Sequence, residues 1–216
     1  MKAPVAPPKA PPKDCPLCPR LAAFRHENQK KFPSYWNAPV PSFGPLDASI
    51  LIAGLAPGLH GANQTGRPFT GDWAGDLLYA TLLKFGLATG KYEERANDPL
   101  KLVGIRIANA VRCVPPQNKP EPSEINTCRQ FLISELETLP KIKVILALGK
   151  IAHDSTCKTL GARIATHPFK HGVAYDIGRF KLISSYHCSR YNTNTGVLTT
   201  PMFEKVVQDA KTLAGL

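Results

Sequence analysis

Short apolar runs alternate along the chain with longer segments in which apolar residues recur every three or four positions. The short runs contain many β-branched residues and end in glycine or a polar residue, a pattern typical of buried parallel strands. They predict strands at residues 49–53, 105–111, 144–148 and 180–185, with a hairpin partner for the last of these at 173–177.

The longer segments have the spacing of amphipathic helices. They predict helices at residues 17–28, 73–85, 123–139 and 202–213. Ser123 is the expected N-cap of the third helix, and residues 32–45 are expected to form a loop. Because strands alternate with helices, we predict an α/β sandwich on a short, mostly parallel sheet.

Three of the four predicted strands lead directly into unusual polar segments, which begin at Gly54, Asn109 and His187. In open α/β sheets, ligands bind beyond the carboxyl ends of the strands. The pattern therefore predicts an active site where these three segments meet.

The charge of the chain points to a polyanionic partner. Its 216 residues suffice for one well-packed domain and include 27 Lys and Arg against 16 Asp and Glu, a formal net charge of +11. Nucleic acid is the first candidate for such a basic protein, although excess lysine can also serve solubility alone. We expect the protein to be a monomer. We expect no membrane partner, because no apolar run approaches the roughly 20 residues needed to cross a bilayer.

Residues 1–13 are rich in proline, alanine and lysine and lack the apolar core of a secretory signal. We therefore expect a disordered basic tail at 1–13, followed by a single domain at 14–216. Six cysteines without an export signal favour reduced thiols or a metal site over disulfides. The expected location is the cytoplasm, where the protein would act on DNA of the nucleoid.

The most informative segment runs from Gly54 to Asp72 and reads GLAPGLHGANQTGRPFTGD. Its five glycines allow a loop to bring bare backbone close to a ligand. It contains neither the Walker spacing nor GxGxxG, so we do not expect a nucleotide cofactor. Asp72 is its single carboxylate and the candidate for orienting or deprotonating water, although it also suits the N-cap of the next helix. Phe69 can stack on a planar base or pack in the core.

Asn109 and His187 lie at the ends of two other predicted strands. An asparagine offers a donor beside an acceptor, which complements the imide edge of a base, but it can equally make structural turn contacts. His187 can hydrogen-bond the oxygen of a leaving base, or it can be structural. Arg190 and Tyr191 follow closely and can press into a stack of bases.

Four of the six cysteines are spaced as ligands, two in a CxxC pair and two separated by 14 residues among turn formers: Cys15, Cys18, Cys113 and Cys128. Four thiolates can close a zinc site or hold an iron–sulfur cluster, and the spacing does not distinguish the two. The second pair can also be small buried side chains without a ligand. Cys157 and Cys188 are left outside the site.

Together these residues resemble the uracil-DNA glycosylase superfamily, and most closely its family 5 (type B) enzymes. The resemblance covers nearly the whole chain from Asp14 and rests on four motifs in order: Cys15-x-x-Cys18, GLAPGLHGANQTGRPFTGD, NAVRCVPPQNKP with Cys128 following, and HCSRYNTNTG. It implies a three-layer α/β/α sandwich with a short, mainly four-stranded parallel sheet. It also implies a 4Fe-4S cluster on the four cysteines, with zinc as the less favoured alternative.

The implied activity is hydrolysis of the N-glycosidic bond of uracil in DNA, and of hypoxanthine and other deaminated or damaged bases, by a monofunctional glycosylase that starts base excision repair. Related families carry a carboxylate two positions after the first glycine of the loop, where this chain has Ala56. In type B enzymes the Asp of the FTGD segment is the proposed replacement, and Asp72 matches it. Asn109 and His187 complete the implied catalytic set, whereas Asp76 is expected at the surface.

The resemblance also implies contacts to the flipped nucleotide and the DNA. The residues expected there are Gly54, Ala56, Gly58, His60, Asn63, Phe69, Ser189, Arg190 and Tyr191. Arg112, Lys119 and Arg190 are the expected phosphate contacts.

Two other function classes remain open from the residues alone. One is a metal-stapled DNA-binding module without catalysis, in which Asp72 and His187 would be structural. The other is a hydrolase of a small nucleoside or phosphate ester, which would act on free deoxyuridine as well as on DNA.

Overall fold

The computed structural model describes residues 6–216, so residues 1–5 of the predicted tail lie outside the described residues. Within 6–216 the main sheet has five strands in the order β4-β1-β5-β7-β6. The strands are β1 (Ile50–Gly54), β4 (Ile105–Asn109), β5 (Val144–Leu148), β6 (Ala174–Ile177) and β7 (Phe180–Ser185). The first four strands in that order are parallel, and β6 pairs antiparallel with β7, as the hairpin prediction required.

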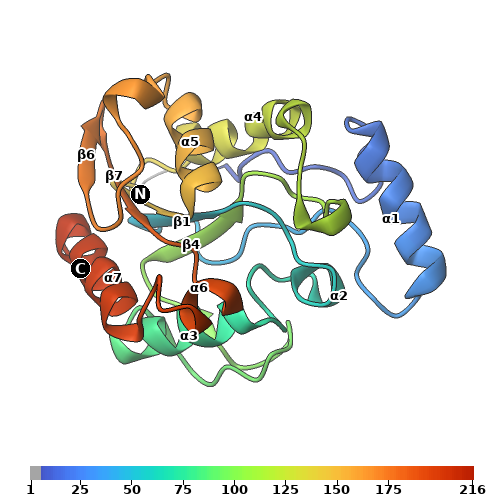
Figure 1. Ribbon diagram of the computed structural model, residues 1–216, viewed down its shortest axis with the longest axis horizontal. Helices are drawn as coiled ribbons and strands as arrows, with labels where there is room; N and C mark the ends of the chain where they lie inside the picture. The colour runs from blue at the N-terminus through green and yellow to red at the C-terminus, as the bar shows by residue number, and fades with distance from the viewer. Residues whose placement is uncertain (1–5) are drawn as a thin grey trace.

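Helices lie on both faces of this sheet (Figure 1). They are α1 (Pro19–Lys31), α2 (Ala62–Thr65), α3 (Trp73–Lys84), α4 (Pro122–Thr138), α5 (Lys150–Thr159), α6 (Arg190–Asn194) and α7 (Thr200–Ala214). For residues 6–216 the predicted three-layer sandwich with a mainly four-stranded parallel sheet is therefore confirmed, and the antiparallel β6 extends the sheet at one edge.

The core follows from the alternation of side chains along each strand. In β1, Ile50 and Ile52 point to one face, where α3 and α7 pack, whereas Leu51 and Ala53 point to the other, where α4 and α5 pack. Both sets are fully buried. The apolar run that predicted β1 is continuous because the strand is covered on both sides.

Some boundaries differ from the predictions. Ser123 is not an N-cap, because α4 already begins at Pro122, whose fixed φ suits the first helical position. Glu121 caps the helix instead in a capping box with Glu124, whose carboxylate accepts the backbone N–H of Glu121 at 2.7 Å. The strand predicted at 105–111 ends at Asn109.

Several short elements were not predicted. They are β2 (Ala88–Thr89), β3 (Lys101–Leu102), the helices α2 and α6, and the 3-10 turns Pro116–Asn118 and Ile164–Thr166.

Residues 6–13 carry neither helix nor strand and run beside α4. The backbone N–H of Lys9 donates to Ser134 Oγ at 2.7 Å, and its ammonium group donates to Gln130. The disorder of the tail stays a prediction. Among residues 6–216, no helix combines the length and the apolar character needed to cross a membrane.

Candidate active site

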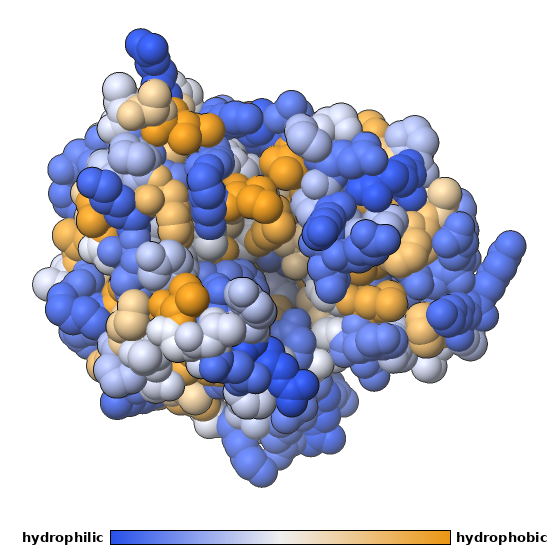
Figure 2. All heavy atoms as spheres, viewed as in Figure 1, coloured by the Kyte–Doolittle hydropathy of each residue, from blue (hydrophilic) through white to orange (hydrophobic). Residues whose placement is uncertain are grey.

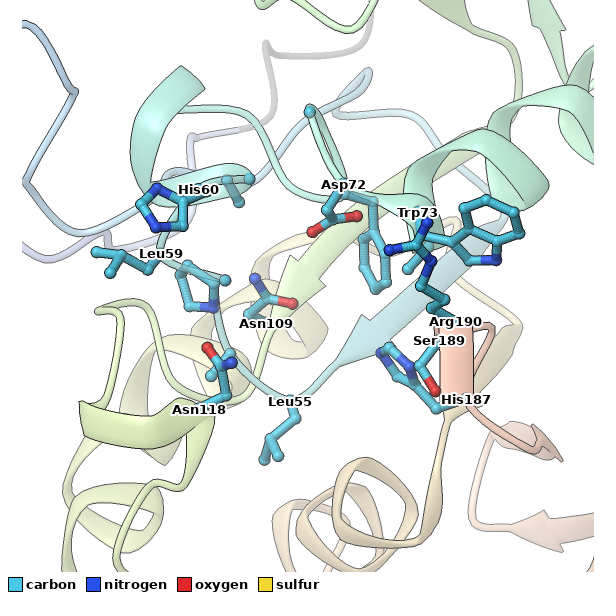
Figure 3. A pocket seen from close by; sticks show the side chains of 18 residues that line it. Leu55, Leu59, His60, Asp72, Trp73, Asn109, Asn118, His187, Ser189 and Arg190 are labelled. Atoms are coloured by element: carbon cyan, nitrogen blue, oxygen red, sulfur yellow. The ribbon is translucent and has the colours of Figure 1, made fainter. Parts of the chain in front are cut away.

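The polar segments after β1, β4 and β7 meet around one cavity of about 540 Å³, a size typical of small-molecule sites. In the space-filling view the surface is hollowed near its centre, between the parts of the chain that carry α2 and α6 (Figure 2). Asp72, Asn109 and His187 line the cavity from three different segments (Figure 3). The predicted meeting point of the three strand ends is therefore confirmed.

Asp72 ends the glycine-rich loop and is the N-cap of α3. Its Oδ1 accepts the backbone N–H of Gly75 at 3.1 Å. A Cβ on Gly61 would come within 2.5 Å of Oδ2, so the absence of a side chain there makes room for the carboxylate at the cavity wall. The capping role and the cavity position therefore coexist.

The environment of Asp72 favours its protonated form. Burial raises the pKa of Asp72, although the backbone N–H groups of Gly75 and Ala74 act in the opposite direction. A carboxylate with a raised pKa accepts a proton more readily than an ordinary surface aspartate. Asp76, one helical turn further on, is exposed, as predicted.

Asn109 is buried at the end of β4, directly opposite Gly54 in the register of β1 and β4. A Cβ on Gly54 would lie 2.3 Å from Asn109 Oδ1 and 2.8 Å from the Phe69 ring. Gly54 therefore lies beneath these two side chains and gives them space, which differs from the direct contact to the base that the sequence suggested.

Phe69 and His187 form one wall of the cavity. Their ring centroids are 6.1 Å apart with an interplanar angle of 29°. Phe69 has a left-handed backbone with φ +51°, and its carbonyl lies so close to Gly75 that a Cβ there would be 2.0 Å away. Burial lowers the pKa of His187, so its imidazole is neutral near pH 7 and can donate one hydrogen bond without carrying a charge.

The second half of the glycine-rich loop is held by a buried ion pair that sequence reasoning missed. The Arg67 guanidinium makes two 2.7 Å contacts to the Asp98 carboxylate, and its Nε donates to Thr70 Oγ1 at 2.8 Å. Tyr79 donates to the carbonyl of Pro68 at 2.6 Å in the same loop. These contacts fix the segment that presents Phe69 and Asp72.

The other predicted contact residues divide into two groups. Those that line the cavity with the catalytic candidates and Phe69 are Ala56, Gly58, His60, Ser189 and Arg190. Asn63 is instead buried, and its Nδ2 donates to Asn37 Oδ1 at 2.9 Å, so it supports the loop from behind. Tyr191 is 74% exposed and lies outside the cavity lining at the start of α6.

Asn118 lines the cavity and was missed. Its side chain is seen in Figure 3. Asn118 is the last residue of the turn Pro116–Asn118, and its own backbone is left-handed, with φ +56°. Asparagine adopts this conformation more readily than most residues, so an Asn among prolines was the available signal. Trp73 also lines the cavity, and the Arg190 guanidinium lies 5.1 Å from its ring centroid.

The assignment of Arg112 to phosphate binding was wrong. Its side chain is buried and pairs with Glu135 at 3.4 Å beneath the sheet edge, where a phosphate cannot reach it. A buried guanidinium needs such a partner because an unpaired charge is poorly tolerated there. Lys119 is exposed, and its phosphate contact stays a prediction.

Cys15, Cys18, Cys113 and Cys128 line one small cavity between the N-terminal segment, α1 and α4. The backbone N–H of Arg112 donates to Cys128 Sγ at 3.4 Å. Within residues 6–216, no three or more His, Cys, Asp and Glu side chains form a group arranged for a single metal ion.

Cys157 and Cys188 are fully buried elsewhere. The thiol of Cys188 donates to the carbonyl of Ala74 at 3.4 Å, which supports leaving it out of the ligand set.

Comparison with known proteins adds independent findings. The model of the uracil DNA glycosylase superfamily matches residues 41–211. The Type-5 uracil-DNA glycosylase of Thermus thermophilus is 48% identical over 94% of this chain and 94% of its own. The corresponding Type-5 proteins of Mycobacterium tuberculosis and Pyrobaculum aerophilum are 41% and 37% identical, each over 94% of this chain, and over 79% and 90% of their own.

Proposed function

Because this chain belongs to the uracil DNA glycosylase superfamily, we propose that it releases uracil from DNA by hydrolysing the N-glycosidic bond, as a monofunctional enzyme that starts base excision repair. The observation that carries this proposal is the single cavity in which a carboxylate, an amide and an imidazole come together from three strand ends. The names of the Type-5 relatives support the same activity.

The target nucleotide must leave the duplex, because the glycosidic bond cannot be reached inside the base stack. The formal net charge of +11 favours contact with the phosphates, and Arg190 at the cavity rim is placed to make one. Tyr191, exposed beside it, is suited to stack against the bases that the flipped nucleotide leaves behind.

Inside the cavity each side chain has a distinct proposed task. The Phe69 ring stacks on the base, and the Asn109 amide pairs with its donor and acceptor edge. Ala56 stands where related families carry a carboxylate, which leaves the cavity less selective. We therefore include hypoxanthine and other deaminated bases among the proposed substrates.

Hydrolysis requires one water and one proton acceptor. The water oxygen bonds to the sugar carbon C1′ while the C1′–N bond breaks. The electron pair of the C1′–N bond leaves with the base. Asp72 orients the water and accepts its proton. His187 donates a hydrogen bond to the base oxygen on which negative charge develops, and its neutral state preserves that donor.

We propose that the four grouped cysteines hold a 4Fe-4S cluster, with zinc as the less favoured ligand. The donor set fits, since all four side chains are thiols that line one cavity. Burial and the charges of neighbouring thiolates, Cys128 foremost, raise the pKa of Cys113 to about 12, so four thiolates require a compensating cation. The cluster would be structural, tying α1 to α4 and to the segment that carries Asn118.

We also propose that the protein acts as a monomer in the cytoplasm, on DNA of the nucleoid.

The deciding experiment is release of free uracil from a uracil-containing duplex, with an intact abasic strand left behind. Binding of that duplex without release would favour the non-catalytic module. Equal activity on free deoxyuridine and on DNA would favour a small-molecule hydrolase.

The pH dependence of excision tests the role of Asp72. Since Asp72 must be deprotonated to accept a proton and its pKa is raised, activity should rise with pH through a limb above the ordinary aspartate value of about 4. The lowered pKa of His187 keeps that residue neutral, so it should add no limb near or above pH 6.5. Single-turnover rates from pH 4 to 9 measure this, and a flat acid side would contradict the assignment.

The colour of the purified protein tests the cluster. We expect visible thiolate-to-iron absorption and about four irons per chain. Cys113→Ser should abolish the colour, whereas Cys157→Ala, which changes a buried cysteine outside the set, should retain it. A colourless protein with one tightly held zinc would overturn the cluster assignment.

A further inference from the structure

A second group of aromatic side chains lies at one end of the cavity. It consists of Phe32, Tyr35 and His60, whose rings contact one another, and of Trp36, whose ring lies against Gly66 of the glycine-rich loop; these four are here called the aromatic patch. Figure 3 places His60 at the end opposite Trp73 and Arg190. Because His60 also lines the cavity, the aromatic patch is continuous with the proposed active site.

The rings of the aromatic patch are arranged as a surface rather than a core. Phe32 and Tyr35 stack with centroids 4.9 Å apart and an interplanar angle of 13°. His60 meets both rings edge-on, and its Nδ1 lies 3.0 Å from the Tyr35 hydroxyl. His60 is exposed, Trp36 is 38% exposed, and the other two are half-buried.

A buried amide network holds these rings in place. Asn37 has a left-handed backbone, φ +44°, and its Nδ2 donates to the Phe32 carbonyl at 2.7 Å. Its Oδ1 accepts from Asn63 in α2, and the backbone N–H of Trp36 donates to the Gln64 carbonyl at 3.0 Å. The aromatic patch is thereby joined to the glycine-rich loop.

The same loop also fits around the Trp36 ring. A Cβ on Gly66 would lie 2.8 Å from that ring, so the glycine admits it. The loop thus holds partly exposed rings beside the cavity, although the main core does not include them.

Positive charge surrounds the rings. The Lys31 ammonium lies 5.3 Å from the Phe32 centroid, and the Lys13 ammonium lies 4.9 Å from the Trp36 centroid. Lys30 adds a further exposed charge in the last turn of α1. Aromatic rings interleaved with cations are the usual composition of single-strand DNA sites, where bases stack on rings and phosphates meet lysines.

We propose that the aromatic patch is a second base-stacking site, which holds an unpaired nucleobase of the same strand that carries the flipped nucleotide. This inference rests on the proposed glycosylase function. In a duplex, both faces of a base are covered by the neighbouring bases. A base can therefore stack on these rings once it has left the duplex stack. Stacking one neighbour on the aromatic patch would offset part of the unstacking that accompanies flipping. The cavity would then have aromatic rings and cations at both ends. The aromatic patch and its lysines would lie at one end, and Trp73 and Arg190 at the other.

Photo-cross-linking of the unchanged protein tests the site. The probe is single-stranded DNA with one 2′-fluoro-deoxyuridine, which resists hydrolysis, and 5-iodocytosine at successive positions on either side. We expect cross-links to Phe32, Tyr35, Trp36 or His60 from positions on one side. Cross-links confined to other residues would overturn the proposal.

Uracil release from strands shortened on one side gives the second test. For the unchanged protein, removing the nucleotides on the side of the aromatic patch should raise KM about tenfold, the scale of one base–ring stack. In Tyr35→Leu the ratio between long and short strands should fall toward one, whereas the distant Tyr175→Leu should keep it. A ratio in Tyr35→Leu equal to that of the unchanged protein would overturn the aromatic patch as a binding site.

Two controls separate the possible failures. Thermal melting shows whether Tyr35→Leu is folded, and the cross-linking result does not depend on that variant. Failure of the unchanged protein to release uracil from any strand would refute the proposed function. Normal release with the same KM on long and short strands would refute the stacking site alone.

Discussion

Asp72→Asn should lower the rate of uracil release by about 10²–10⁴-fold while leaving the fold intact. Asparagine retains a side-chain oxygen that can accept the Gly75 N–H, so the N-cap of α3 is preserved. Its amide cannot accept the proton of the attacking water. Among the described residues that line the cavity, Asp72 is the sole carboxylate, so no neighbouring carboxylate can replace it.

Asp76→Asn is the matched control, because it removes the same charge one helical turn away on the exposed side of α3. Both variants should melt close to the unchanged protein, and Asp76→Asn should excise uracil at a near-normal single-turnover rate. Parental activity in Asp72→Asn would show that the carboxylate serves α3 alone and would remove it from the mechanism.

Arg67→Met should destabilise the protein by about 3–5 kcal/mol, the usual effect of removing one partner of a buried ion pair. The Arg67 and Asp98 side chains are 4% and 0% exposed, so the substitution leaves a carboxylate uncompensated away from water. Urea unfolding measures the loss. The rate of excision should fall as well, because the same loop positions Phe69 and Asp72.

Two comparisons sharpen this expectation. Lys205→Ala breaks the exposed pair with Asp209 and should change stability by less than about 1 kcal/mol. Arg67→Met combined with Asp98→Leu should recover part of the loss, since no unpaired charge remains. If Arg67→Met unfolds at the same urea concentration as the unchanged protein, the pair does not hold the loop.

The ion pair also predicts how stability depends on pH. Although burial opposes it, the contacts from Arg67 and two backbone N–H groups lower the pKa of Asp98. A lowered pKa in the folded state contributes stability above the unfolded value of about 4, and this contribution is lost as pH falls through the folded value. Arg67→Met should lack this part of the acid dependence.

The fold could be predicted in large part because the signals of its strands and of its longer helices are local. These signals are continuous apolar runs and apolar residues at helical spacing. A strand covered on both faces must be apolar throughout, and Val144–Leu148 was found at its observed bounds for that reason. Short elements such as Arg190–Asn194 escaped, since five residues show no helical period. The N-cap of α4 was misplaced by two residues because Pro122 was not weighed as a helix start.

The site could be predicted where topology decides it. Asp72 lies in the segment after β1, Asn109 ends β4 and His187 follows β7, and parallel strands bring such ends to one edge. Burial and partners could not be predicted. Arg112 forms an ion pair with Glu135, and Asn63 donates a hydrogen bond to Asn37. The local sequence contains no pattern that indicates either interaction.

The same limit applies to the Arg67–Asp98 ion pair that holds the glycine-rich loop and to Asn118. Arg67 and Asp98 stand 31 positions apart, and their pairing depends on the course of the intervening chain. Asn118 enters the cavity through a rare backbone conformation rather than through a motif.

The strand order has a consequence for synthesis of the protein. The adjacent strands β4, β1 and β5 are complete once residue 148 has been made, and they bring Asp72 and Asn109 into place. His187 follows β7, which pairs beside β5 and comes late in the chain. A nascent chain that folds as it emerges from the ribosome would thus acquire base recognition before the group that stabilises the departing base. Under the proposed roles, incomplete chains would bind DNA weakly and leave its glycosidic bonds intact.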